Sequence, residues 1–132
     1  MTTAIKGTVL VVDDDAVTRR VTREILARLG YASEDATNGN EALDALGHCE
    51  YCAVLMDCFM PSMNGFDATA EIRHREGRTR HTPVIAMTVS SSSETAHRCG
   101  AVGADGFLTK PVGMGDLEEL LDHWTRQQQK AG

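Results

Sequence analysis

Four short apolar runs recur along the chain, separated by longer segments of mixed polarity. They cover residues 8–12, 53–56, 84–87 and 107–108. Unbroken apolar runs of this length are typical of strands that are buried on both faces of a parallel sheet. A weaker strand is expected at residues 31–36, directly after Gly30, because glycine commonly ends a helix.

The segments between these runs carry apolar residues at helical spacing. The first such segment predicts a helix with a buried stripe of five residues: Val17, Val21, Ile25, Leu26 and Leu29. Three further helices are predicted from the same kind of stripe: Ala42, Leu43, Ala45 and Leu46; Phe66, Ala70 and Ile72; and Leu117, Leu120, Leu121 and Trp124. A weaker helix is expected over residues 90–102, where four serines open the segment.

Strands and helices therefore alternate five times, and this order predicts an α/β fold. Right-handed crossovers between successive strands give a parallel sheet that is covered by helices on both faces. We expect a flavodoxin-like (βα)5 three-layer sandwich with five parallel strands in the order 2-1-3-4-5. Residues 1–132 are predicted to form a single domain, with a core over about 8–125 and a polar C-terminal tail.

Net charge and hydropathy argue against nucleic acid and membranes as direct partners. The formal net charge of −6 argues against a strongly basic face, so no direct contact with nucleic acid is expected. A basic cluster does occur, and we interpret it as a solvated helix end and loop: Arg73, Arg75, Arg78 and Arg80. No apolar run approaches the roughly 20 residues that span a bilayer, and the first residues do not resemble a signal peptide. We expect a cytoplasmic protein without membrane insertion.

The chain has four cysteines, of which Cys49 and Cys52 form a C-x-x-C next to His48. A redox C-x-x-C normally follows a strand and opens a helix, whereas this one follows a predicted helix and precedes a strand. A zinc site needs about four ligands, and only three candidates lie close together in the sequence. All four cysteines are therefore interpreted as reduced.

Reactive or ion-binding side chains follow four of the five predicted strands. In chain order they are Asp13, Asp14 and Asp15; Asp57; Thr88; and Thr109 and Lys110, with Pro111. Ligands of open α/β sheets bind beyond the carboxyl ends of the strands. With strand order 2-1-3-4-5 these four ends are neighbours, so their side chains are expected to converge.

The residue types that converge fit one kind of chemistry. Clustered carboxylates repel one another unless a cation lies among them, and their oxygens suit Mg²⁺. Lys110 adds a fixed positive charge, and Thr88 adds a hydroxyl that can donate to a phosphoryl oxygen. An aspartate nucleophile, a divalent metal, a lysine and a hydroxyl are the groups needed for phosphoryl transfer.

Four segments of the chain resemble the response-regulator receiver family. They are VVDDD at residues 11–15, LMDCFMPSMNG at 55–65, PVIAMT at 83–88 and GFLTKP at 106–111. The resemblance runs from about residue 8 to residue 124, and the combination of D-x-x-M-P-x-M-x-G with a distal K-P is highly specific. The residues around Asp57 and Thr88 are similar to those in receivers of hybrid histidine kinases.

The resemblance implies a function in a two-component phosphorelay. Such a domain accepts a phosphoryl group from the phosphohistidine of a histidine kinase or a histidine phosphotransfer protein. The reaction depends on Mg²⁺, and the domain then changes conformation to signal to a downstream target. It is not an enzyme in the usual sense, although it assists its own phosphorylation and dephosphorylation.

The resemblance also implies a role for individual residues. Asp57 would be the phosphoacceptor. The metal ligands would be Asp13, Asp14, Asp57 and the backbone carbonyl of Phe59. The residues that stabilise and sense the phosphoryl group would be Thr88, Lys110 and Phe107. The loops would be shaped by Pro61, Gly65 and Pro111, with a cis bond between Lys110 and Pro111.

Four positions depart from the family pattern or flank the phosphoryl group. Asn64 stands where aspartate is commoner in the family, and Val89 stands where a smaller residue is usual. Phe59 and Ser90 occupy the two positions that flank the phosphoryl group. Since neither is expected to orient an attacking water, and Phe59 is large enough to cover the site, we expect slow loss of the phosphoryl group.

Two other readings remain open from the sequence. Residues 13–17 fit the D-x-D-x-[TV] motif of haloacid-dehalogenase-like phosphatases, in which Asp13 would be the nucleophile and Asp15 the acid/base. The later acidic pair of that family is missing here, and the chain is short for a substrate cap. The second alternative is a pure interaction module that is not phosphorylated, which the complete set of site residues argues against.

Overall fold

The computed structural model describes residues 5–89 and 92–131 and contains one five-stranded parallel sheet. Its strands are β1 (Thr8–Val12), β2 (Ala32–Ala36), β3 (Ala53–Asp57), β4 (Val84–Thr88) and β5 (Gly106–Thr109). Its helices are α1 (Ala16–Arg28), α2 (Gly39–His48), α3 (Gly65–Glu76), α4 (Ser93–Ala101) and α5 (Met114–Ala131). The strand order is β2-β1-β3-β4-β5, which confirms the predicted flavodoxin-like topology.

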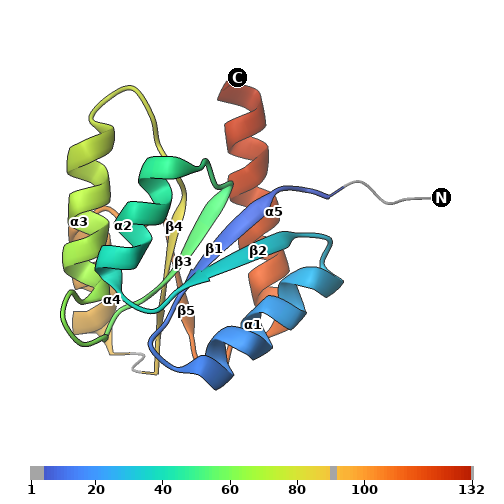
Figure 1. Ribbon diagram of the computed structural model, residues 1–132, viewed down its shortest axis with the longest axis horizontal. Helices are drawn as coiled ribbons and strands as arrows, with labels where there is room; N and C mark the ends of the chain where they lie inside the picture. Colours follow the sequence, from blue (N-terminus) through green and yellow to red (C-terminus); the bar gives the residue numbers. More distant parts are fainter. Residues whose placement is uncertain (1–4, 90–91, 132) are drawn as a thin grey trace.

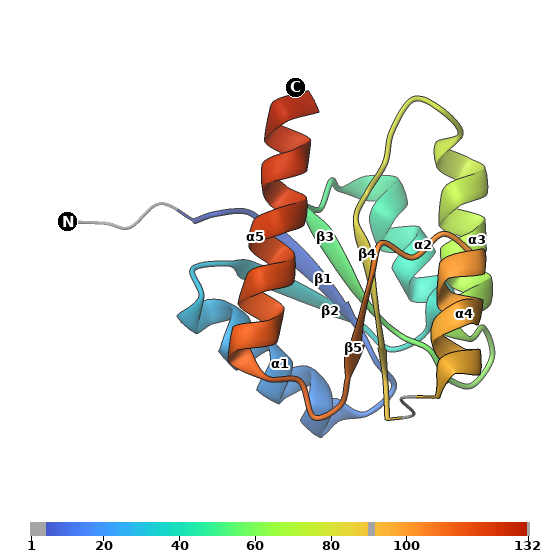
Figure 2. The ribbon, with the colours of Figure 1, turned by 180° about the vertical axis from the view of Figure 1, so that it is seen from behind.

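The molecule has three layers (Figures 1 and 2). Helices α1 and α5 cover one face of the sheet, and α2, α3 and α4 cover the other. The middle strands β1, β3 and β4 are almost fully buried, because both of their faces are covered. This burial explains why their sequences are unbroken apolar runs instead of alternating patterns.

Successive strand residues point to opposite faces and build separate cores. On the α1 and α5 side, Val9, Val11 and Leu55 pack with Leu26 of α1 and Leu117 of α5. The other face of the sheet packs against α2 and α3: Leu10, Val12, Val54, Met56, Ala42, Leu43, Ala68 and Ile72. A third cluster joins the end of β3 to α3 and α4, and consists of Cys58, Phe66, Ala86 and Cys99.

Side-chain caps begin four of the helices. Asp15, Asn38, Asn64 and Ser92 each accept a hydrogen bond from a backbone N–H three residues later. Such caps satisfy donors that a helix leaves unpaired at its first turn. Asn64 therefore has a structural task that aspartate can also perform, which is consistent with its exchange for the commoner residue. Asp15 is thus the N-cap of α1.

The predicted core stripe of α1 is wrong at two positions. Val17 is 68% exposed and Val21 is 50% exposed, while Thr22, Leu26 and Leu29 form the buried side. A spacing of four residues exceeds the 3.6-residue turn, so a strict four-residue repeat drifts around the helix axis. At the N-terminal end of α1 the stripe therefore no longer faces the core. Val17 and Val21 lie at the surface there, beside the carboxyl end of the sheet. Ala70 of α3 is likewise exposed.

Helix α4 begins at Ser93, three residues later than the segment predicted from the sequence. The first two residues of the serine run, Ser90 and Ser91, lie outside the described residues.

Candidate functional site

The register of the sheet brings the predicted site residues to one edge. Val12 lies opposite Met56, so Asp13 follows β1 beside Asp57 at the end of β3. Thr88 lies opposite Thr109 at the ends of β4 and β5, and the backbone N–H of Lys110 donates to the carbonyl of Thr88 at 2.7 Å. Four neighbouring strand ends thus contribute to one site, as the sequence predicts.

Lys110 bridges two buried carboxylates. Its Nζ lies 2.6 Å from Oδ2 of Asp13 and 3.3 Å from Oδ2 of Asp57. Asp13 is fully buried, and its Oδ1 also accepts a hydrogen bond from the backbone N–H of Asp15 at 2.9 Å. One lysine therefore faces two carboxylates, which leaves a net negative charge that a bound cation would offset.

Asp57 is 5% exposed, and burial raises its pKa to about 6. The nearby Lys110 ammonium opposes this rise in pKa, while the negative charge of Asp13 adds to it. The backbone N–H of Phe59 donates to Oδ1 of Asp57 at 3.3 Å, so the chain folds back over the carboxylate directly after it. A cation beside Asp57 would favour its ionised form.

Asp13, Asp14 and Asp57 together form a candidate metal centre. One ligand atom from each lies within 4.8 Å of the others, and Asp14 is the exposed member of the group. Mg²⁺ prefers a few carboxylates together with water and phosphate oxygens. Three carboxylates at a site that is open to solvent on one side match this preference. The donor set therefore fits the magnesium ion that the sequence predicts.

The two residues expected to respond to the phosphoryl group, Thr88 and Phe107, lie on the neighbouring strands β4 and β5. Thr88 is fully buried at the end of β4. Phe107 is half-buried and packs against the third cluster, which contains Cys58, Phe66, Ala86 and Cys99. A movement of the Phe107 ring would therefore change the packing of α4, which supplies Cys99.

The loop after Asp57 turns back tightly onto β3. The backbone N–H of Gly65 donates to the carbonyl of Cys58 at 3.0 Å, and a Cβ on Gly65 would lie 2.1 Å from the carbonyl oxygen of Asp57. Only glycine allows this approach. Pro61 is exposed within the loop, and Ser62 has a positive φ of 69°. On the opposite side of the site, the bond between Lys110 and Pro111 is cis.

The residues expected to flank a phosphoryl group are partly described. Phe59 is 52% exposed, and its ring packs edge-on against Phe66 with the ring centroids 5.5 Å apart. Val89 is 77% exposed, and Ser90 lies outside the described residues. The slow loss of the phosphoryl group stays a prediction.

One supporting residue of the site, Arg19, was not found from the sequence. Arg19 donates from a guanidinium nitrogen to the carbonyl oxygen of Asp13 at 2.8 Å and pairs with Asp35 at 3.1 Å. It holds the acidic loop against α1 and β2. Its position one turn into the helix after an acidic triplet is a signal that could have indicated this role.

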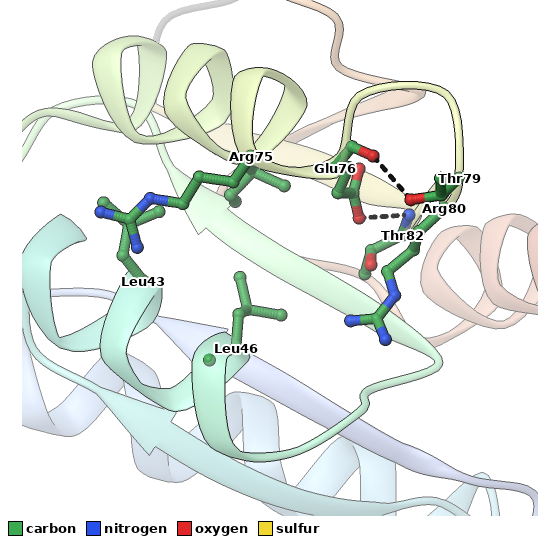
Figure 3. Close-up of a pocket in the computed structure, with 9 residues that line it drawn as sticks. Leu43, Leu46, Arg75, Glu76, Thr79, Arg80 and Thr82 are labelled. Atoms are coloured by element: carbon green, nitrogen blue, oxygen red, sulfur yellow. Dashed lines mark hydrogen bonds between the residues drawn. The ribbon is translucent and has the colours of Figure 1, made fainter.

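A cavity of about 230 Å³ lies between α2 and α3, where Leu43, Leu46 and Ile72 meet Arg75 and Arg80 (Figure 3). It is lined by none of the acidic site residues.

The arginine cluster is divided between structural and surface roles. Arg73 donates to the carbonyls of Gly103 and Thr82 and pairs with Asp105 at 2.7 Å, so it ties α3 to the loops before β4 and β5. Arg75 pairs with Glu71, and Arg80 pairs with Glu50. Arg73 therefore has a structural role, whereas Arg75 and Arg80 are exposed, as the predicted solvated surface requires.

Comparison with known proteins agrees with this geometry. The profile of the response regulator receiver domain matches residues 9–122, and the chain belongs to this family. It is a receiver domain of two-component signal transduction. Among curated proteins it is 36% identical over 121 residues to the hybrid signal transduction protein dokA of Dictyostelium discoideum. That match covers 92% of this chain and 7% of dokA, so the chain corresponds to a small part of that relative's length.

Two solved structures are informative about the site. The receiver domain of the sensor histidine kinase PA1611 from Pseudomonas aeruginosa has a magnesium ion coordinated in its active site cleft. It is 31% identical, with a TM-score of 0.82 and coverage of 90% of this chain and 97% of that one. The receiver domain of Ssk1 from Saccharomyces cerevisiae was solved with the phosphotransfer protein Ypd1. That match has 25% identity, a TM-score of 0.85 and coverage of 96% and 94%.

Within the described ranges, no helix is both long enough and apolar enough to cross a membrane.

Proposed function

We propose that this receiver domain accepts a phosphoryl group on Asp57 in a Mg²⁺-dependent reaction. The observation that carries the proposal is the convergence of Asp13, Asp14 and Asp57 within ligand distance of one another, with Lys110 bridging two of them. The donor is the phosphohistidine of a histidine kinase or a histidine phosphotransfer protein. A cytoplasmic location is part of the proposal, and the four unpaired cysteines support it.

In the proposed reaction, a carboxylate oxygen of Asp57 attacks the phosphorus atom. A P–O bond forms as the P–N bond to the donor imidazole breaks, and the imidazole leaves with the bonding electron pair. Lys110 neutralises charge on the phosphoryl oxygens, because it already lies 3.3 Å from Asp57. Mg²⁺, held by Asp13, Asp14, Asp57 and the carbonyl of Phe59, would neutralise further charge on these oxygens.

The same site accounts for a conformational response. A phosphoryl group adds up to about two negative charges and new acceptor oxygens next to Thr88. These acceptors favour a conformation in which Thr88 moves toward Asp57 and the ring of Phe107 follows. To reverse a population from about 1:99 to 99:1, phosphorylation must favour the second conformation by roughly 5.5 kcal/mol. The surface formed by α4, β5 and α5 is the one that changes.

The structure argues against the phosphatase alternative. Asp13 is fully buried and is hydrogen-bonded through both of its carboxylate oxygens. Asp15 directs its carboxylate to the backbone N–H and hydroxyl of Thr18 at the start of α1, so it does not act as an acid/base beside Asp13.

The exposed valines indicate where the donor binds. Val17, Val21 and Val89 surround a hollow beside Lys110, with Ile25 and Val112 among its other lining residues. Apolar side chains gathered at a rim are typical of protein-binding surfaces. Because the hollow adjoins the lysine of the site, a protein bound there can present a phosphohistidine to Asp57. The complex of the Ssk1 receiver with Ypd1 supports a phosphotransfer protein as the partner.

The direct test of phosphoryl uptake is incubation with Mg²⁺ and acetyl phosphate or phosphoramidate, followed by intact mass. The proposal expects the mass of one added phosphoryl group, and no gain when EDTA removes the metal. A protein that stays unmodified under both conditions would instead be an interaction module.

We expect Asp14→Ala to weaken Mg²⁺ binding by at least tenfold, because the metal loses one charged ligand. The measurement is a titration with Mg²⁺ followed by NMR. Asp44, an exposed carboxylate on α2, provides the matched control, and Asp44→Ala should bind Mg²⁺ like the parent. Equal affinities for the parent and Asp14→Ala would remove Asp14 from the metal site.

We expect Val21→Asp to slow phosphotransfer from a phosphorylated phosphotransfer protein by about tenfold or more, since it places a charge in the apolar contact. Uptake from phosphoramidate, which needs no docking, should be unchanged. Ala70→Asp, at an exposed position on α3, should leave both rates unchanged. If Val21→Asp slows both reactions equally, or slows neither of them, the exposed valines do not form the surface that binds the donor.

A further inference from the structure

Two cysteines that take no part in the proposed reaction face each other directly behind the site. Cys58 follows Asp57, and Cys99 lies on α4. Their Sγ atoms are 3.5 Å apart, and the two side chains are 1% and 3% exposed. They are unpaired thiols in this structure. The contact joins residues that are 41 positions apart in the sequence, so it is made by the fold and not by local chain geometry.

We propose that Cys58 and Cys99 form a reversible disulfide that locks α4 against the end of β3 and so opposes the response to phosphorylation. The regulatory half of this inference rests on the proposed function, whereas the formation of the disulfide does not. A disulfide has an S–S length of about 2.05 Å, so the two sulfur atoms need to approach by roughly 1.5 Å. A small shift of α4 toward β3 brings them to bonding distance.

The position of Cys99 explains why such a bond would matter for signalling. Cys99 belongs to the third cluster, against which Phe107 packs. One residue earlier, the guanidinium of Arg98 lies 3.9 Å from the ring centroid of Phe66, and Phe66 in turn packs against Phe59. Helix α4 is therefore joined to the loop around Asp57 by two side-chain contacts, and Figure 2 shows it beside α3. A covalent bond at one of these contacts would hold α4 in its unphosphorylated position.

The chemistry requires an oxidant, for which we name a small-molecule disulfide such as glutathione disulfide. The thiolate of one cysteine attacks a sulfur of the oxidant, forms a mixed disulfide and releases one thiolate, which takes up the proton. The second cysteine then attacks the mixed disulfide and releases the second thiol. Two protein thiols are oxidised and one disulfide is reduced to two thiols. Since both cysteines are buried, the oxidant reaches them when α4 moves away from α3.

The first part of the test asks whether the bond forms. Cys49 and Cys52 are replaced by alanine in every protein tested, so that only the buried pair can react. After incubation with glutathione disulfide and then alkylation in denaturant, we expect both remaining thiols to be protected and a peptide pair linking Cys58 to Cys99. Dithiothreitol should reverse the link. Cys99→Ala and, separately, Cys99→Ser should give no link. A parent protein in which both thiols stay alkylatable would overturn the proposal.

The second part asks whether the bond opposes the response. Beryllium fluoride, a stable mimic of an acyl phosphate, is titrated in the presence of Mg²⁺ into the oxidised and reduced proteins and followed by NMR. Coupling between two sites is reciprocal, so the locked protein should bind the mimic at least about fivefold more weakly. Equal affinities in the two forms would overturn the regulatory role while leaving the disulfide. A reduced protein that binds no beryllium fluoride would count against the proposed function instead.

Discussion

Asp57→Ala is expected to abolish phosphoryl uptake from acetyl phosphate or phosphoramidate. The variant removes the carboxylate that forms the new P–O bond, and no second carboxylate can take its place. Asp13 is fully buried and bonded to Lys110, and Asp14 is the exposed member of the group. Intact mass after incubation with Mg²⁺ and phosphodonor measures the loss, and Asp44→Ala is the control that should be modified like the parent.

The same variant should remain folded. Burial raises the pKa of Asp57 to about 6, so its ionised carboxylate opposes folding at neutral pH in the absence of metal. Circular dichroism should therefore show a native spectrum and a thermal midpoint no lower than that of the parent at pH 7 without Mg²⁺. A folded Asp57→Ala protein that still gains phosphoryl mass would show that another residue is the acceptor.

Gly65→Ala should destabilise the protein strongly. The new Cβ would lie 2.1 Å from the carbonyl oxygen of Asp57 and 2.9 Å from the Cα of Cys58. Both neighbours are backbone atoms, which cannot rotate aside as a side chain can. Either the start of α3 or the end of β3 must move, at a cost of about 3 kcal/mol by comparison with overpacked cores.

A thermal unfolding experiment measures this effect, and the expected fall in midpoint is on the order of 10 °C. Gly47→Ala is the matched control, because Gly47 also lies in a helix but a Cβ there meets no atom within 4 Å. That variant should keep or slightly raise the midpoint, since alanine is the better helix former. An unchanged midpoint in Gly65→Ala would mean that the loop after Asp57 is looser than the structure indicates.

The strands were the most predictable part of the fold. The run at residues 8–12 matches β1 in full, and the runs at 53–56 and 84–87 are each one residue shorter than β3 and β4. The missing residues are Asp57 and Thr88, which are polar and belong to the candidate site. The apolar pattern ends at these polar residues, and the residues after the strands were therefore predicted to converge, as the structure shows for Asp13, Asp57 and Lys110.

The helices were less predictable, because exposure depends on how each helix is rotated against the sheet. The valines of α1 fit a stripe in the sequence, yet Val17 and Val21 lie at the surface. Spacing alone does not show whether an apolar residue of a helix packs in the core or lies exposed at the surface.

Contacts between individual side chains of distant segments were not predicted from the sequence. The bond from Arg19 to the carbonyl of Asp13 and the approach of Cys58 to Cys99 depend on side-chain placement across elements. Residue type and strand order therefore predicted which groups share the site, while only the structure shows that Lys110 lies closer to Asp13 than to Asp57.

The most direct test of the central claim is to locate the phosphoryl group after reaction with acetyl phosphate and Mg²⁺. The acyl phosphate is trapped by reduction, and the modified peptide is sequenced by tandem mass spectrometry. Our account predicts one modified residue, Asp57, in the peptide that contains Cys58. Modification of Asp13 instead would contradict it and favour the phosphatase mechanism, and a chain without any modification would contradict the function as a phosphoacceptor.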